Sequence, residues 1–420
     1  MKVSKTAVIV GASHAGAQLA ASLRQDGWEG RIVLVGDEPH LPYHRPPLSK
    51  TFLSGEKGLH EILIRHAESY ASHEIELMFE TRVTAIDRPA RELVLADGAR
   101  LGYDKLALCV GGRARKVEIP GAHLPGVFEL RSLADVERIR EVLGTARQVV
   151  VVGGGYIGLE TAAMLKKLEV AVTVLEAAPR VLARVTAPEV SAFYERVHAE
   201  EGVRILTGTA VAAFEGADRL TGVRDAAGVT HPADFAVVGV GIEPNVELAA
   251  EAGLEVRNGI VVDDCARTAD PDIFAAGDCT MHPSPLYGWL RLESVNNAVE
   301  QAKAAAAAIC GKDKPHASLP WFWSDQYDLK LQIAGLSAGY DRLVLRGDAT
   351  AGRSFSAFYL KGDRILAVDC VNRPLEFMQS KRLIADAVPV DAAALADEGR
   401  PFKALVQGWI ETQTTEKVNG

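Results

Sequence analysis

Three glycines at fixed intervals are the residues of this chain whose spacing most clearly indicates chemistry. Gly153, Gly155 and Gly158 follow the apolar run VVVV and precede a segment with helical periodicity. A strand, a glycine turn and a helix in this order are typical of a dinucleotide site, because the main chain can approach a pyrophosphate at the positive end of the helix. Glu176 ends the next apolar run, at the distance of about 20 residues where an acid binds a ribose.

The N-terminus carries a second copy of this arrangement. The strand AVIV leads into Gly11, Ser13 and Gly16, a helix follows, and the next strand ends near Asp37. Ser13 stands where the middle glycine is expected, and its small side chain still allows a pyrophosphate to approach. Two dinucleotide units in one chain indicate an enzyme in which one bound nucleotide reacts with the other.

Composition and charge exclude several other classes of protein. The chain has 420 residues, 48% of them apolar, and a formal net charge of −9. The negative charge argues against a nucleic-acid partner, since phosphate binding needs basic surface. No apolar run reaches the ~18 residues of a membrane helix, and Ala7–Val10 already serve as the first strand rather than as a signal peptide. We therefore expect a cytoplasmic protein, without a metal site.

The five cysteines are expected to be small buried hydrophobic residues. Cys109, Cys265, Cys279, Cys310 and Cys370 form no C-x-x-C or C-x-x-x-x-C spacing, and none follows the first glycine turn. Cys279 adjoins a candidate cofactor residue, Asp278, so a redox role stays open for this cysteine.

The order of the patterns predicts an α/β fold. It has two Rossmann-like dinucleotide-binding domains and a C-terminal α+β domain. The first predicted dinucleotide-binding domain comprises residues 1–113 and 244–318, the second residues 114–243, and the C-terminal domain residues 319–420. Helices are predicted after Ser132, which forms a capping box with Asp135, and after Ser294. The proline-dense stretch PHLPYHRPPLSK is expected to be a loop.

These motifs together resemble the ferredoxin reductases of bacterial oxygenase systems, the family of putidaredoxin reductase, palustrisredoxin reductase and the biphenyl dioxygenase reductase component. The resemblance covers nearly the whole chain, and RPPLSK and FWSDQ are its most specific motifs. The matching motifs are RPPLSK (45–50), GGGYIGLE (153–160), GIEPN (241–245), IFAAGD (273–278), RLESVNNAVEQA (291–302) and PWFWSDQ (320–326).

The resemblance implies a glutathione-reductase-like fold, with an FAD-binding domain of residues 1–113 and 244–318 and an NAD-binding domain of residues 114–243. It further implies FAD in the first unit, NADH in the second, and hydride transfer from the nicotinamide to the flavin. The residues that it indicates for FAD binding, most of them in the first unit, are Gly11, Ser13, His14, Ala15, Gly16, Asp37, Arg45, Lys50, Val83, Arg131, Asp278 and Val295. The residues that it indicates in the second unit are Gly153, Gly155, Tyr156, Ile157, Gly158, Glu160, Glu176, Arg184 and Gly241.

The resemblance also implies roles for a few residues near the reacting rings. Lys50 and Glu160 are expected to form an ion pair that aligns the rings, because hydride transfer needs alignment more than acid–base help. Tyr156 is expected to be an aromatic gate over the nicotinamide site. Trp323 is expected to lie near the flavin, and Trp321 is the less favoured candidate for that place.

The expected electron acceptor is a 2Fe-2S ferredoxin that supplies a monooxygenase or a ring-hydroxylating dioxygenase. A rubredoxin, a quinone or oxygen remains an alternative acceptor, and a redox-sensing flavoprotein remains an alternative function. The ferredoxin is expected to dock transiently and electrostatically on a monomer or weak homodimer. Lys312, Lys314, Lys330 and Arg291 are the candidates for a local basic docking surface.

The cysteine pattern generates the first testable prediction. Because no dithiol is expected beside the flavin, the Cys279→Ser variant should reduce its flavin with NADH within a few-fold of the parent rate in stopped-flow mixing. Blocking the accessible thiols should likewise leave ferredoxin reduction intact. Loss of activity in either case, with FAD still bound, would indicate a disulfide-type mechanism.

Overall fold

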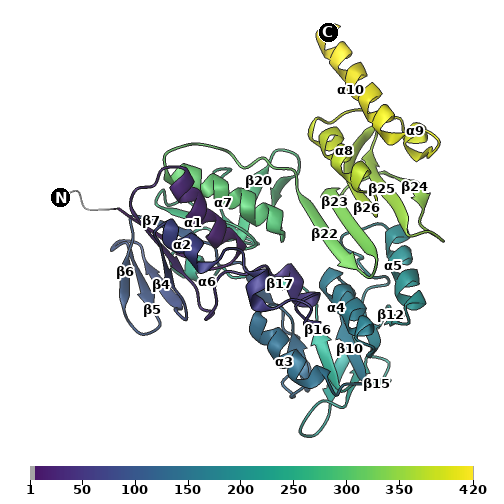
Figure 1. Ribbon diagram of the computed structural model, residues 1–420, viewed down its shortest axis with the longest axis horizontal. Helices are drawn as coiled ribbons and strands as arrows, with labels where there is room; N and C mark the ends of the chain where they lie inside the picture. The colour runs from purple at the N-terminus through teal and green to yellow at the C-terminus, as the bar shows by residue number, and fades with distance from the viewer. Residues whose placement is uncertain (1–4, 420) are drawn as a thin grey trace. The chain divides into compact units, whose positions relative to one another are not determined.

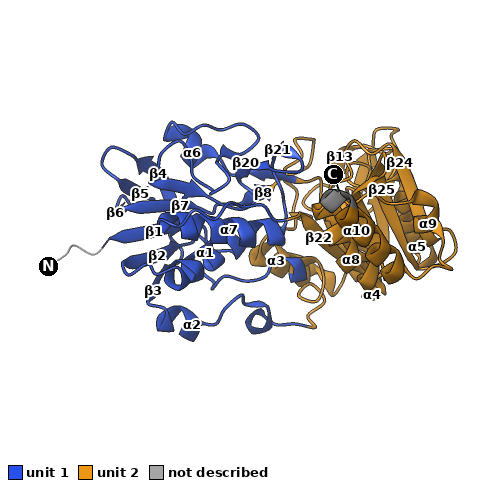
Figure 2. Ribbon diagram, turned by 90° about the horizontal axis from the view of Figure 1, so that it is seen from above, with its two compact units in different colours: residues 1–47, 57–113, 242–318 blue, residues 48–56, 114–241, 319–420 orange. Residues whose placement is uncertain are grey.

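The computed structural model describes residues 5–419, and the chain divides into two compact units (Figure 2). Unit 1 comprises residues 1–47, 57–113 and 242–318, and unit 2 comprises residues 48–56, 114–241 and 319–420. The chain thus passes between the units within the proline-dense stretch, where it forms only a short 3-10 helix, Pro46–Ser49.

Unit 1 is built on a five-stranded parallel sheet with the order β19-β7-β1-β2-β3. Strands rich in valine, isoleucine and leucine form it because both faces of the sheet are covered. The strands are β1 (Thr6–Val10), β2 (Arg31–Val35), β3 (Ile75–Met78), β7 (Lys105–Leu108) and β19 (Ile273–Ala275).

Alternate residues of β1 enter two different cores of unit 1. Ala7 and Ile9 pack against α1 (His14–Gln25) and α7 (Val295–Ile309), which lie side by side in Figure 1. Val8 and Val10 pack against an antiparallel sheet on the opposite face. That sheet consists of β4 (Val83–Asp87), β5 (Glu92–Leu95) and β6 (Arg100–Gly102). The period of two along a strand produces this division.

Shorter elements complete unit 1. They are a 3-10 helix (Leu59–Ile62), α2 (Ala67–Ser72), α6 (Glu247–Glu251), β18 (Ile260–Val261), β20 (Thr280–Ser284) and β21 (Gly288–Leu290). Two further strands lie at the unit boundaries, β8 (Gly112–Ala114) and β17 (Ile242–Pro244).

Unit 2 contains a second five-stranded parallel sheet, with the order β12-β11-β10-β16-β9. Its strands are β9 (Val127–Glu129), β10 (Gln148–Val152), β11 (Ala171–Leu175), β12 (Arg204–Leu206) and β16 (Phe235–Val238). Its helices are α3 (Leu133–Leu143), α4 (Tyr156–Lys167) and α5 (Pro188–Glu200). An antiparallel sheet of β13 (Val211–Glu215), β14 (Gly222–Asp225) and β15 (Thr230–Pro232) covers one face through Phe214 and Val223.

The C-terminal part of unit 2 is an antiparallel sheet with the order β22-β23-β26-β25-β24. Its strands are β22 (Trp321–Gln326), β23 (Leu329–Gly335), β24 (Arg342–Asp348), β25 (Ser354–Lys361) and β26 (Arg364–Val371). One face packs on α4 and α5 through Leu159, Phe193 and Tyr194. The other is covered by α8 (Pro374–Ala385), α9 (Ala392–Ala396) and α10 (Phe402–Asn419).

The predicted fold class is confirmed, since two parallel α/β sheets are joined by a C-terminal α+β part. The predicted capping box of α3 is present, because the Ser132 hydroxyl accepts from the Asp135 N–H and the Asp135 carboxylate accepts from the Ser132 N–H. The Ser294 hydroxyl likewise caps α7 at Asn297. Among residues 5–419, no helix is long and apolar enough to cross a membrane.

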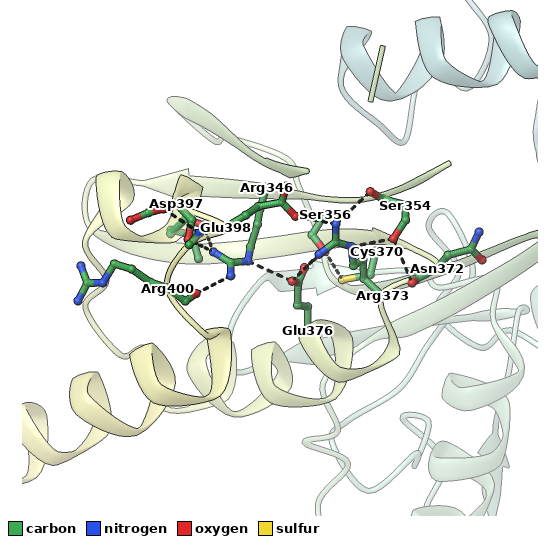
Figure 3. A network of polar contacts seen from close by, with 12 residues as sticks. Arg346, Ser354, Ser356, Cys370, Asn372, Arg373, Glu376, Asp397, Glu398 and Arg400 are labelled. Carbon is green, nitrogen blue, oxygen red and sulfur yellow. Dashed lines mark hydrogen bonds and ion pairs between the residues drawn. The ribbon is translucent and has the colours of Figure 1, made fainter. Parts of the chain in front are cut away.

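A buried arginine ties the helices of the C-terminal part to its sheet (Figure 3). Arg346 on β24 donates to the Glu376 carboxylate of α8 at 3.1 Å, and its side chain is 4% exposed. The same guanidinium donates to three carbonyl groups at and beyond the C-terminal end of α9, those of Leu395, Asp397 and Arg400. One side chain therefore satisfies buried or partly buried acceptors from two segments of the chain, α8 and residues 395–400.

Removing this guanidinium should destabilise the protein strongly. The Arg346→Met variant keeps apolar volume but leaves the Glu376 carboxylate and three carbonyl groups short of donors, which should lower the free energy of unfolding by about 3–5 kcal/mol. Urea unfolding of unit 2 measures this. The matched control is Arg342→Met on the exposed end of the same strand, and equal stability of the two variants would contradict the assignment.

Candidate functional site

The first glycine turn joins β1 to α1 and leaves no room for side chains at two positions. A Cβ atom on Gly11 would lie 2.2 Å from the carbonyl oxygen of Cys109, and one on Gly16 would lie 2.0 Å from that of Gly11. Gly11 has a φ of +113°, which glycine adopts without strain. The turn brings the main chain to the start of α1, as a bound pyrophosphate requires.

The predicted residues of the IFAAGD and RLESVNNAVEQA motifs lie beside this turn. A Cβ atom on Gly277 would approach the Cβ atoms of Ala15 at 3.3 Å and Ala298 at 3.6 Å. The Gly277 N–H donates to Gln301 Oε1 at 2.8 Å. Asp278, which follows Gly277, and the N-terminal turn of α7 at Val295 are thereby held beside the start of α1.

A set of polar side chains surrounds Ser13, the residue that replaces the middle glycine. Arg45 donates from Nε to the Ser13 hydroxyl at 3.2 Å and from Nη2 to Glu38 Oε1 at 2.8 Å. The Tyr43 hydroxyl donates to the other Glu38 oxygen at 2.5 Å. His14 contacts His44 through Nε2 and Nδ1 at 3.2 Å.

The structure places three further predicted FAD residues, whose contact with FAD stays a prediction. Asp37 is exposed beyond the end of β2, while Arg45 engages the neighbouring acid, Glu38. Val83 is 7% exposed and packs in the core between β4 and the parallel sheet, so its side chain is occupied by apolar neighbours. Arg131 precedes α3 in unit 2, where its N–H donates to Asp135.

The second glycine turn joins β10 to α4 in unit 2 and repeats the packing of the first. A Cβ atom on Gly153 would lie 2.5 Å from the carbonyl oxygen of Gly239, and one on Gly158 would lie 2.0 Å from that of Gly153. A Cβ atom on Gly155 would meet no heavy atom of the described residues within 4 Å. The first and third glycines therefore serve close packing, and the middle one faces open space where phosphates could approach. This geometry fits a dinucleotide.

The predicted ribose acid also holds the second turn in shape. Glu176, directly after β11, accepts from the Gly154 N–H at 2.5 Å and from the Ala178 N–H at 2.7 Å. Arg184 is exposed, and its Nη2 would be 3.7 Å from a Cβ on Gly241, so the structure brings these two predicted residues together. Ile157, at the second position of α4, is 43% exposed.

Lys50 and Glu160 form the expected ion pair, and both residues belong to unit 2. Lys50 Nζ lies 2.5 Å from Glu160 Oε2, with the side chains 15% and 2% exposed. The Ser49 hydroxyl donates to the same oxygen at 2.7 Å, and the Ser324 hydroxyl donates to Oε1 at 2.7 Å. Three donors thus offset the desolvation of the buried carboxylate.

The sequence alone did not identify Ser49 and Ser324 as partners of Glu160. Both lie inside the motifs RPPLSK and FWSDQ. The signal available was the strand period of two, which puts Phe322, Ser324 and Gln326 on one face of β22.

The aromatic residues of β22 are divided by the same period. The Phe322 ring contacts the Tyr156 ring with a centroid distance of 4.8 Å, on the face toward α4. Trp321 and Trp323 lie on the other face, 5.4 Å apart, and Trp321 packs against Phe377 and the Lys381 ammonium. Burial raises the pKa of the Tyr156 phenol well above its usual value, so its hydroxyl stays neutral.

The cysteines are free thiols, four of them buried and Cys310 partly buried. Burial raises the pKa of Cys279 to about 12 and the pKa of Cys109 well above its usual value. Neither is therefore a thiolate at neutral pH, as expected for packing residues. Within residues 5–419, no group of histidine, cysteine and acidic side chains is arranged to hold a metal ion.

The structure corrects part of the predicted basic docking surface. Lys312 and Lys314 both pair with Asp26, the C-terminal cap of α1. A helix of 12 residues is about 18 Å long, so these lysines lie at the end of α1 remote from the glycine turn. Arg291 does lie beside Asp278, to whose carbonyl oxygen it donates at 3.4 Å.

Comparisons with known proteins agree with this geometry over the whole chain. Residues 5–302 match the model of the pyridine nucleotide-disulphide oxidoreductases, and residues 321–406 match that of the reductase C-terminal domain. Putidaredoxin reductase CamA of Pseudomonas putida is 48% identical over 97% of this chain and 98% of its own length. The ferredoxin–NAD(+) reductase component of the biphenyl dioxygenase system of Paraburkholderia xenovorans is 36% identical over 96% and 98%.

Solved structures give the same result. The reductase of the covalent putidaredoxin reductase–putidaredoxin complex has a TM-score of 0.93 at 48% identity, covering 96% of this chain and 98% of that one. The ferredoxin reductase for the CYP199A2 system of Rhodopseudomonas palustris has a TM-score of 0.92 at 43% identity, covering 95% and 99%. This chain therefore belongs to the pyridine nucleotide-disulphide oxidoreductase family and, within it, to the ferredoxin reductases of bacterial oxygenase systems.

Proposed function

We propose that this protein is an FAD-dependent reductase that takes a hydride from NADH and passes single electrons to a 2Fe-2S ferredoxin of a bacterial oxygenase system. The observation that carries the proposal is the presence of two dinucleotide turns in one chain together with the buried Lys50–Glu160 pair. The names of relatives and solved structures, which include ferredoxin reductases of dioxygenase systems and of the CYP199A2 system, support the same acceptor.

The two nucleotides have separate sites in this proposal. FAD binds to unit 1, with its pyrophosphate at the first glycine turn and its ribityl chain at Asp278, whose carboxylate can accept hydrogen bonds from hydroxyl groups. NADH binds to unit 2, with its pyrophosphate at the second turn and its adenine ribose at Glu176. Bound FAD supplies the chemistry that amino acids lack, the conversion of a two-electron donor into a one-electron donor.

The side chains of the protein bind and orient rather than transfer protons. Lys50 and Glu160 hold the reacting rings in register, and Tyr156 occupies the nicotinamide site until NADH arrives. The N-terminal turn of α7 at Val295 directs the positive end of the helix dipole to the flavin, where it stabilises the negative charge that reduction brings. Trp323 lies beside the flavin in this proposal.

The acceptor docks transiently and electrostatically. Of the four candidates, Lys330 and Arg291 remain, with Arg291 paired to Glu293 at 2.7 Å, whereas Lys312 and Lys314 lie elsewhere. The protein works in the cytoplasm as a monomer or weak homodimer. Stopped-flow reduction by NADH, followed by mixing with a 2Fe-2S ferredoxin, tests the proposal. Fast reoxidation by the ferredoxin and slow reoxidation by air are expected. Preferred reoxidation by a rubredoxin, a quinone or oxygen would change the acceptor, and slow turnover with every carrier would favour a redox sensor.

The position of Glu176 predicts a preference for NADH over NADPH. A 2′-phosphate on the ribose would be repelled by this carboxylate, and a preference of about tenfold in kcat/KM needs only ~1.4 kcal/mol of repulsion. The Glu176→Ser variant should narrow the preference, with Arg184 available to the phosphate. Glu189→Gln, an exposed charge change on α5, should leave it unaltered. Equal kcat/KM for both nucleotides in the parent enzyme would refute the assignment.

The Lys50–Glu160 pair generates a second kinetic prediction. The Glu160→Ala variant should keep FAD but slow flavin reduction at saturating NADH by about 10–100-fold, because the rings lose their alignment. Single-turnover mixing measures the rate, and the visible flavin spectrum reports bound FAD. Glu169→Ala, an exposed site just beyond α4, is the control. Loss of FAD from the Glu160 variant would instead assign the residue a structural role.

A further inference from the structure

The Glu160 carboxylate is the end of a hydrogen-bond chain that continues well beyond its first neighbours. Ser324 Oγ donates to Glu160 Oε1 at 2.7 Å, and Gln326 Nε2 donates to Ser324 Oγ at 3.2 Å. Gln326 Oε1 lies 2.8 Å from His198 Nε2, and His198 Nδ1 lies 2.9 Å from the Tyr327 hydroxyl. The chain thus joins α4, β22 and α5 within unit 2.

Chemistry fixes the direction of every bond in this chain. A carboxylate only accepts, so Ser324 must donate to it and has its oxygen free to accept from the Gln326 amide. The Gln326 carbonyl oxygen then accepts from His198, which must carry its proton on Nε2. In a neutral imidazole the other nitrogen accepts, so Tyr327 donates to His198 Nδ1. All four hydrogens point toward Glu160, and bonds aligned in this way polarise and strengthen one another.

The inner residues of this hydrogen-bond chain are buried, so water does not compete for their hydrogen bonds. Ser324 and His198 are 0% exposed and Gln326 is 2% exposed, while Tyr327 is partly exposed at the turn between β22 and β23. Burial lowers the pKa of His198 to about 4, against the opposing effects of the Gln326 hydrogen bond and of Glu201, so the imidazole is neutral at neutral pH. Burial raises the pKa of the Tyr327 phenol, which is flanked by Glu201 and Arg353, so its proton is retained.

The need of buried polar groups for hydrogen-bond partners does not by itself require that all four donors point toward Glu160. Such groups need partners wherever they are buried, but their donors need not all point to one acceptor. Here they converge on the carboxylate that pairs with Lys50, and each link lies on a different turn or strand position. The orientation of Glu160 Oε1 is therefore set from as far away as Tyr327, and Oε2 is left to Lys50 and Ser49.

We propose that Ser324, Gln326, His198 and Tyr327 are positioning residues that orient the Glu160 carboxylate, and through it Lys50, for flavin reduction by NADH. This inference rests on the proposed function for its kinetic consequence. Its structural content, a neutral His198 with the proton on Nε2 and a chain directed at Glu160, stands independently of the reaction.

Nitrogen-15 NMR of histidine-labelled holoenzyme tests the direction of the chain without turnover. The His198 signals, assigned by their loss in His198→Asn, should show the neutral Nε2–H form and titrate only near pH 4. The Gln326→Glu variant replaces the amide by a carboxylate facing His198 and should raise that titration point by at least about one pH unit. An Nδ1–H form, or titration at an ordinary pKa in the parent protein, would overturn the proposal.

Single-turnover kinetics test the positioning role. Ser324→Ala removes the donor to Glu160 and should slow flavin reduction at saturating NADH by about tenfold, with little change in the NADH concentration at half-maximal rate. Ser324→Thr keeps the hydroxyl on a strand position that suits a β-branched residue and should restore the rate. Thr161→Val is the matched control, because this buried hydroxyl on α4 donates only to the Ile157 carbonyl.

The outcomes separate the inference from the proposed function. Parent-like rates in Ser324→Ala, with the parent enzyme reduced by NADH, would refute the positioning role alone. Failure of NADH to reduce the parent enzyme would refute the proposed function, while the NMR result would still decide the direction of the chain. If Ser324→Ala does not fold, Gln326→Met, which also interrupts the chain, replaces it and should slow reduction in the same way.

Discussion

The close approach of main chain to main chain at the two glycine turns is the constraint on which the structure depends. At Gly16 and at Gly158 a single added carbon would lie 2.0 Å from a carbonyl oxygen, well inside van der Waals contact. Neither α1 nor α4 could then lie against the sheet that precedes it. Both parallel sheets, and the two positive helix ends that a dinucleotide needs, therefore follow from the absence of side chains at these positions.

A second constraint acts within unit 2, where a carboxylate is buried under the C-terminal sheet. Glu160 is stable in that place only because an ammonium and two hydroxyl groups come from segments distant in the chain, 49–50 and 324. The C-terminal part is thus more than an appended domain. Its strand β22 completes the polar surroundings of a residue on α4, which explains why residues 319–420 form one compact unit with residues 114–241.

The alternation of side chains along β22 places successive residues on opposite faces of the C-terminal sheet, in different surroundings. Phe322, Ser324 and Gln326 face Tyr156, Glu160 and His198, while Trp321 and Trp323 lie on the other face, where Trp321 packs against Phe377 of α8. Arg346 holds the helices on that face to the sheet through the Glu376 carboxylate of α8 and through three carbonyl groups at and beyond the C-terminal end of α9, so its role also depends on the path of the main chain there. The polar network on one face of this sheet thus surrounds the Glu160 carboxylate, and the network of Arg346 on the other face holds the covering helices.

The sequence by itself determined the two dinucleotide turns, the fold class and the Lys50–Glu160 pairing suggested by family resemblance. Glycine spacing, strand hydrophobicity and capping residues are local properties. They can be predicted from the sequence because they depend on steric contacts between residues that are close in the chain. Contacts over long sequence separation were decided only by the tertiary structure. It showed that Glu38 engages Arg45, that Lys312 and Lys314 pair with Asp26, and that Ser324 reaches Glu160 across 164 positions. No local periodicity encodes such partners, because they meet only when separate elements pack together.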